Sequence, residues 1–200
     1  MHFDLVVVGT SLGGLNALRL LLAALPATFP LPIAIVQHRH KESGGLLLAA
    51  LQAVSHLPIV ETEDKALIVP GQVYLAPADY HLLVELGHFA LSTDEHVCHA
   101  RPSIDVLFES AADVYGSRLI GVILTGASRD GAEGLATIKA QGGVAVVQSP
   151  NSAESRTMPE EALRRTAADQ VLPLADIAPY LGTLCHVRAN DGRTNRPHRP

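Results

Sequence analysis

Short runs of apolar residues recur along the chain, separated by segments with a helical repeat. Leu5 to Val8 and Ile33 to Val36 are uninterrupted apolar runs, which predict strands buried on both faces of a sheet. The segment between them predicts a helix, because its leucines return at helical spacing: Leu15, Leu18, Leu22 and Leu25. This alternation of strand, helix and strand predicts parallel pairing through crossover helices.

The same alternation continues along the rest of the chain. Further strands are expected at Pro58–Val60, Leu119–Leu124 and Val144–Val147. Further helices are expected at Gly45–Val54, Ile104–Tyr115 with Ser103 as its cap, Gly131–Gln141, Glu160–Ala168 and Leu174–Leu181.

The middle of the chain has a different pattern. Gln72–Ala76, His81–Leu86 and Phe89–Thr93 are short alternating segments that predict an antiparallel insertion, and Gly87-His88 suits a tight hairpin turn. The predicted fold class is therefore α/β: a doubly wound, mainly parallel sheet with helices on both faces and an antiparallel hairpin near one edge. One domain is expected over residues 1–185, followed by a polar, disordered tail over residues 186–200.

Composition narrows the function classes. Apolar residues make up 48% of the 200 residues and the formal net charge is −5, so the chain has the composition of a globular protein and no basic excess that would favour nucleic acid. No apolar stretch is long enough for membrane insertion, and no basic cluster introduces a signal peptide. Cys98 and Cys185 have no metal-binding spacing and are expected to be free thiols. We therefore expect a cytoplasmic protein.

Three chemically complementary residues follow three of the predicted buried strands. Ser11 follows the first strand, His38 the second, and Asp130 lies in the segment after Leu124. Because ligands bind beyond the carboxyl ends of parallel strands, we expect these side chains to meet at one edge of the sheet. A hydroxyl, an imidazole and a carboxylate are the groups that nucleophilic acyl transfer requires.

The chemistry explains why these residue types occur together. Serine is a poor nucleophile unless a base such as His38 takes its proton, and a carboxylate fixes the tautomer of that base. Around Ser11, the turn GTSLGG contains Gly9, Gly13 and Gly14, which allow a strand to turn directly into a helix without a Cβ clash.

Each residue also has a structural interpretation. Ser11 can cap the first helix, His38 can be a structural histidine, and Asp130 with Glu133 matches a capping box. Taken singly, the structural role is the better explanation for His38 and Asp130. The coincidence of three triad residue types after three strands favours the catalytic interpretation.

Two other binding chemistries match the sequence less well. GTSLGG differs by one residue from a dinucleotide-binding fingerprint, but the second strand ends in Gln37-His38 where an acidic residue is expected. His38 and His40 form an HxH pair, but no further ligand stands at a recognisable spacing, so no metal is expected. The histidines at 56, 96 and 99 are interpreted as surface residues.

Six motifs occur in order along the chain and resemble those of one family. They are GTSLGG, VQH at Val36–His38, APADYHL at Ala76–Leu82, RPSIDVLFESAA at Arg101–Ala112, LTGASRDGAEGL at Leu124–Leu135 and MPEEAL at Met158–Leu163. Together they resemble the catalytic domain of the CheB-type chemotaxis protein-glutamate methylesterases over roughly residues 4 to 182.

The resemblance implies an activity and a site. Ser11 would be the nucleophile, His38 the base and Asp130 the third member of the triad, while the backbone amides near Leu12 and Ala127 would form the oxyanion hole. The substrate would be γ-glutamyl methyl esters on the cytoplasmic domain of methyl-accepting chemoreceptors, giving glutamate and methanol. Some members also deamidate receptor glutamines. No cofactor is implied.

The chain departs from the family pattern at several positions. Leu12 replaces a hydroxyl-bearing residue, Ala127 replaces a methionine, and Arg39-His40 replaces Met-Pro. A non-catalytic or altered-substrate signalling module on the same fold is therefore the alternative.

Members of the family usually carry an N-terminal receiver domain, and the catalytic motifs here begin near residue 4. Either phosphorylation does not regulate the activity, or a separate response-regulator chain does, or the sequence is truncated.

Overall fold

A parallel sheet forms the centre of the molecule. The computed structural model describes residues 2–39 and 45–186, and within these ranges seven parallel strands pair in the order β3-β4-β2-β1-β7-β8-β9. They are β1 (Leu5–Thr10), β2 (Ile33–Gln37), β3 (Ile59–Glu61), β4 (Val73–Leu75), β7 (Leu119–Ile123), β8 (Val144–Gln148) and β9 (Gln170–Leu172). The predicted fold class is confirmed.

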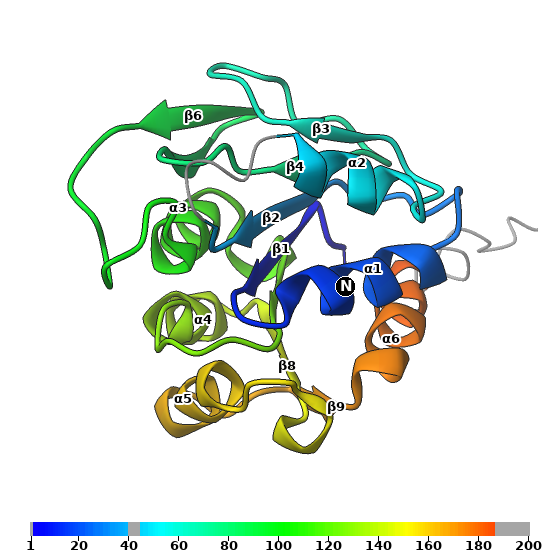
Figure 1. Cartoon of the computed structure of the whole chain (residues 1–200), viewed down its shortest axis with the longest axis vertical. Helices are drawn as coiled ribbons and strands as arrows, with labels where there is room; N and C mark the ends of the chain where they lie inside the picture. The colour runs from blue at the N-terminus through cyan, green and yellow to red at the C-terminus, as the bar shows by residue number, and fades with distance from the viewer. Residues whose placement is uncertain (1, 40–44, 187–200) are drawn as a thin grey trace, which may run out of the picture.

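Helices cover both faces of this sheet (Figure 1). One face carries α1 (Gly14–Ala24), α2 (Leu46–Gln52) and α6 (Leu174–His186), and the other carries α3 (Ile104–Tyr115), α4 (Ala132–Ala140) and α5 (Thr157–Arg165). Val6 and Val8 of β1 belong to the first core, whereas Leu5 and Val7 belong to the second. Apolar residues on both faces explain why the strands have uninterrupted apolar sequences.

The predicted antiparallel insertion is partly wrong. β4 is a parallel strand between β2 and β3 and is buried at all three of its residues, so it belongs to the main sheet. Only β5 (His81–Glu85) and β6 (His88–Ser92) pair antiparallel, as a separate two-stranded sheet. This hairpin is attached to α3, where the Val84 amide donates to the Ser110 hydroxyl at 3.1 Å.

Two other elements differ from the expectation. β9 has only three residues, two of them exposed, and such a short edge strand has no detectable alternation. α5 begins at Thr157 rather than Glu160, because Pro159 is accommodated in the first turn of a helix. The predicted tail lies outside the described residues apart from the end of α6. Within the described ranges, no helix has the length and apolar character needed to cross a bilayer.

Gly9 allows α3 to approach β1 closely. A Cβ at this position would lie 2.3 Å from Cγ2 of Ile104, inside the core. We expect Gly9→Ala to lower the free energy of unfolding by about 1–3 kcal/mol, because the core must shift to relieve the overlap. Urea denaturation measures this, with Gly182→Ala as the control, since a Cβ there meets nothing within 4 Å. Equal losses in the two variants would contradict the packing explanation.

Candidate active site

Strand register brings the predicted catalytic residues to one edge of the sheet. Thr10 at the end of β1 pairs with Gln37 at the end of β2, and Gly9 pairs with Ile123 at the end of β7. The hydrogen bonds continue one step further: the Ser11 amide donates to the Thr125 carbonyl and the His38 amide to the Thr10 carbonyl, both at 3.0 Å. The residues that follow the three strands therefore leave the sheet side by side.

His38 and Asp130 are in direct contact. Nε2 of His38 lies 2.7 Å from Oδ2 of Asp130, and the Asp130 side chain is fully buried. Because an ionised carboxylate only accepts hydrogen bonds, Nε2 carries the proton and donates it. Nδ1 is then the unprotonated nitrogen, which is the state that a general base requires.

The N-terminus of α3 holds Asp130 in place. Oδ1 accepts from the Ser103 hydroxyl at 2.8 Å and from the Asp105 amide at 3.1 Å, and Oδ2 also accepts from the Ile104 amide at 2.7 Å. Burial opposes the charged carboxylate, but the bonds from His38 and these amides outweigh it and hold the pKa of Asp130 below its ordinary value. Asp130 is therefore an anion at neutral pH.

The structure contradicts both capping interpretations. The N-cap of α4 is Gly131, with no side-chain hydrogen bond, so Asp130 and Glu133 do not form a capping box. Asp130 binds the start of α3 instead, far away in the sequence. The N-cap of α1 is Gly13, also without a side-chain bond, so Ser11 does not cap that helix.

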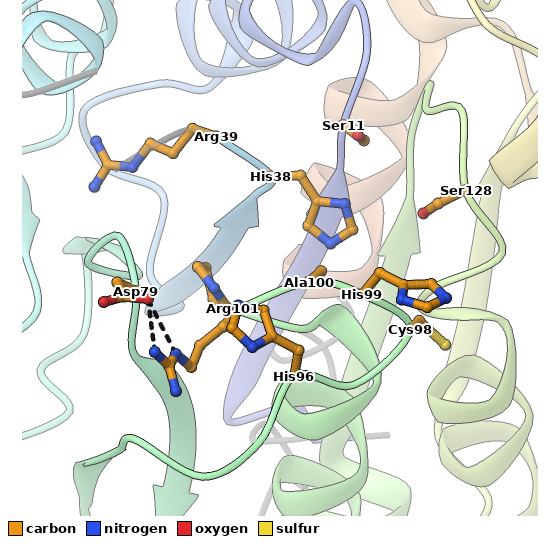
Figure 2. Close-up of a pocket in the computed structure, with 11 residues that line it drawn as sticks. Ser11, His38, Arg39, Asp79, His96, Cys98, His99, Ala100, Arg101 and Ser128 are labelled. Carbon is orange, nitrogen blue, oxygen red and sulfur yellow. Dashed lines mark hydrogen bonds and ion pairs between the residues drawn. The ribbon is translucent and has the colours of Figure 1, made fainter. Parts of the chain in front are cut away.

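Ser11 and His38 line the same cleft, which has a volume of about 540 Å³ (Figure 2). Among the hydrogen bonds of the described residues, none joins the Ser11 hydroxyl to the imidazole. Such contacts are often long in ligand-free enzymes and tighten when substrate binds. The structure thus joins His38 to Asp130 directly and places Ser11 beside them as a neighbour in the cleft.

Two backbone amides near Ser11 are available to a ligand. Within the described ranges, neither the Leu12 nor the Ala127 amide donates a hydrogen bond, and both residues are exposed. The Thr125 hydroxyl donates to the Leu12 carbonyl at 2.9 Å, which ties the two segments together. Leu12 precedes the N-cap of α1, where the helix favours developing negative charge, and Ala127 offers a loop amide, so the two can serve as an oxyanion hole.

Gln37 is a positioning residue that the sequence analysis did not single out. Its side-chain amide donates to the carbonyls of Ser11 at 2.8 Å and His38 at 2.9 Å, so it links the turns that carry both. A Cβ on Gly14 would lie 2.0 Å from Oε1 of Gln37, which explains the glycine at this position. The signal that could have identified Gln37 from the sequence is a polar side chain at the end of a buried strand.

The opposite wall of the cleft comes from a loop. His96 and His99, interpreted from sequence as surface residues, are exposed but line the cleft together with Cys98 and Arg101 (Figure 2). Within the described ranges neither cysteine forms a disulfide, as expected. His40 of the HxH pair lies outside the described residues.

A group of possible metal-ligand atoms lies beneath the cleft. In the described ranges, atoms of Cys98, Asp105 and Asp130 lie within 4.8 Å of one another. The Asp130 oxygens already accept four hydrogen bonds, and Oδ1 of Asp105 accepts from the Gly134 amide at 2.7 Å. These carboxylates therefore have a structural role in the protein itself.

Asp105 makes stability depend on pH. Burial raises its pKa to about 7; the Gly134 amide opposes the shift and the charge of Asp130 adds to it. The unfolded chain loses this proton near pH 4, so the contribution of Asp105 to stability falls as pH rises from about 4 to about 7. We therefore compare the free energy of unfolding of Asp105→Asn with that of the wild type. We expect the difference to shift in favour of the variant by more than about 1 kcal/mol between pH 4 and pH 8. Urea denaturation at both pH values tests this; a constant difference would contradict it.

Comparisons with known proteins identify the family of this chain. A family model described as CheB methylesterase matches residues 6–181. A Leptospira interrogans relative is 49% identical over 179 residues, covering 89% of this chain and 93% of its own; its name provisionally assigns it the activities of protein-glutamate methylesterase and protein-glutamine glutaminase. A protein-glutamate methylesterase of Myxococcus xanthus is 41% identical over 180 residues, and the match covers 90% of this chain and 54% of that protein.

A solved structure shares the fold. The crystal structure of the Thermotoga maritima CheB methylesterase catalytic domain superposes with a TM-score of 0.87 at 34% identity, over 92% of this chain and all of that one.

Proposed function

This chain belongs to the CheB methylesterase family, and we propose that it hydrolyses γ-glutamyl methyl esters on the cytoplasmic domain of chemoreceptors through Ser11, His38 and Asp130. Family membership confirms the predicted class of enzyme, a carboxylic-ester hydrolase. The observation that supports the triad most strongly is the 2.7 Å bond between His38 and a buried Asp130 at the edge that carries Ser11.

The first half of the reaction forms an acyl-enzyme. Nδ1 of His38 takes the proton of Ser11 as Oγ attacks the ester carbonyl, and the ionised Asp130 stabilises the imidazolium. The amides of Leu12 and Ala127 stabilise the negative oxygen of the tetrahedral intermediate. His38 then protonates the departing methanol, which leaves the glutamyl group on Ser11.

The second half repeats these steps with water. His38 takes a proton from water, which attacks the acyl group, and then returns the proton to Ser11 as glutamate leaves. A glutamine side chain can enter the same sequence with ammonia as the leaving group. Two relatives, from Anaeromyxobacter dehalogenans and Nitrosospira multiformis, carry both activities in their names.

Methanol release tests this function. We propose incubating the protein with a chemoreceptor cytoplasmic fragment methylated at its glutamates, and in parallel with a fragment carrying glutamines at the same positions. Methanol from the first fragment supports the esterase, and ammonia from the second adds the deamidase. If neither product appears while the protein is folded, the proposed substrate is wrong.

A further inference from the structure

A second, buried histidine is linked to the candidate catalytic carboxylate. Nδ1 of His81 accepts a hydrogen bond from the Ser103 amide at 3.2 Å, and the hydroxyl of the same Ser103 donates to Asp130 at 2.8 Å. His81 has only 1% of its surface exposed, at the start of β5. One residue, Ser103, therefore separates His81 from the triad.

The other nitrogen of His81 binds the loop that forms the cleft wall. Nε2 lies 3.0 Å from the Glu95 carbonyl. An amide only donates and a carbonyl only accepts, so the two bonds require Nδ1 to be unprotonated and Nε2 to carry the proton. The ring thus holds one defined tautomer between Ser103 and Glu95.

Residues 93–102, here called the cleft loop, are fixed at several points. Arg101 donates to the carbonyls of Thr93 at 2.8 Å and Asp94 at 3.0 Å, and it pairs with Asp79 at 2.7 Å (Figure 2). At the tip, Cys98 and His99 have positive φ angles of 50° and 62°. Such strain persists only where the surroundings impose it, so the cleft loop has an enforced shape beside Ser11.

We propose that His81 is a positioning residue that couples the cleft loop to Asp130. Through Ser103 it orients the hydroxyl that holds Oδ1 of Asp130. Through Glu95 it holds the wall that carries His96 and His99. One side chain therefore sets both the geometry of the proton relay and the shape of the surface that faces the substrate; this second role rests on the proposed function.

Two readouts separate these roles. The rate at which a fluorophosphonate labels Ser11, measured against pH, reports the proton relay without a receptor substrate. The KM for methanol release from the methylated receptor fragment reports the cleft wall. Asp105 and Cys98, which each have a titratable atom within 4.8 Å of Asp130, and Glu109, whose carboxylate also interacts with the charge of Asp130, stay in place in every variant.

Two variants each interrupt one side of the coupling. Ser103→Ala removes a hydrogen bond that partly offsets the negative charge of Asp130, so the carboxylate stabilises protonated His38 more strongly. The labelling rate falls on the acidic side of its pH profile, and this fall, here called the acidic limb, is then expected to occur at a pH about half a unit or more higher. KM is expected to stay unchanged. Arg101→Met releases the cleft loop and is expected to raise KM about fivefold without moving that limb.

Variants of His81 itself decide the proposal. His81→Leu removes both bonds and is expected to produce both effects. His81→Asn keeps an acceptor for the Ser103 amide but is too short to reach Glu95, so it is expected to raise KM alone. If the leucine variant does not fold, the asparagine variant still tests the bond to Glu95.

The outcomes are distinct. If soluble His81 variants keep the KM and the labelling profile of the wild type, the coupling is wrong even if their thermal stability falls. If the wild type is labelled but releases no methanol, the proposed substrate fails, and the acidic limb of the His81→Leu profile still decides the link to Asp130. If the wild type is not labelled at Ser11, the triad and the coupling fail together.

Discussion

Replacing Ser11 by alanine is expected to slow ester hydrolysis by about 10⁴-fold or more. The hydroxyl is the proposed nucleophile, and no other side chain takes its place in the mechanism. The fold should persist, because Ser11 is held through its backbone: its amide binds Thr125, and its carbonyl accepts from Gly14 and Gln37. Initial rates of methanol release from the methylated fragment measure the effect, and urea denaturation checks that the variant is folded.

Ser117→Ala provides a matched control for this substitution. Ser117 is an exposed serine two residues before β7, at the end of the sheet opposite the cleft, so its hydroxyl has no role in the mechanism. We expect wild-type rates from it. If Ser11→Ala also keeps the wild-type rate, Ser11 is not the nucleophile, and the non-catalytic alternative for this site becomes the better account.

Asp130→Asn is expected to lower turnover by roughly 10⁴-fold. An asparagine amide facing Nε2 of His38 presents a donor to a donor, which favours the tautomer with the proton on Nδ1. That tautomer cannot accept the proton of Ser11. Activity should therefore be lost even where the variant is fully folded, as shown by steady-state kinetics at a temperature well below its unfolding transition.

The same substitution should also destabilise the protein. Asp130 accepts from Ser103, Ile104 and Asp105, and an amide group cannot accept all of these bonds, so we expect a loss of about 1–3 kcal/mol in urea denaturation. Asp105→Asn makes the same change of atoms in the neighbouring carboxylate and serves as the control for turnover. If Asp130→Asn loses only stability and keeps its turnover, the carboxylate anchors α3 and has no part in catalysis.

The buried strands and the residues after them could be predicted because their signal is local. Leu5–Val8, Ile33–Val36 and Leu119–Leu124 are apolar runs, and the geometry of parallel sheets places the residues after them at one edge. That rule predicted the contact between His38 and Asp130 from residues 92 positions apart. β4 was misassigned because its three residues look like the neighbouring hairpin strands, and its parallel pairing with β2 and β3 is what distinguishes it.

The remaining features depend on contacts between distant residues. The sequence around Asp130 matches a capping box, which is a local pattern. In the fold, the amides of α3 lie close to Asp130 and donate to it instead. The cleft wall has no periodic pattern, because its shape is imposed by Arg101 and by His81, each bound to backbone carbonyls of the loop. Sequence reasoning could therefore predict that His38 and Asp130 meet at the edge that carries Ser11, but not the surface that faces them.

Combining Ser11→Ala, His38→Ala and Asp130→Asn in one chain tests most directly whether the three side chains act as one unit. Groups that share a single proton relay are not additive in their contributions to the rate. The triple variant is therefore expected to hydrolyse the methylated fragment about as slowly as Ser11→Ala alone. Rate losses that multiply across the three substitutions, or a His38→Ala variant as fast as the wild type, would contradict a shared mechanism.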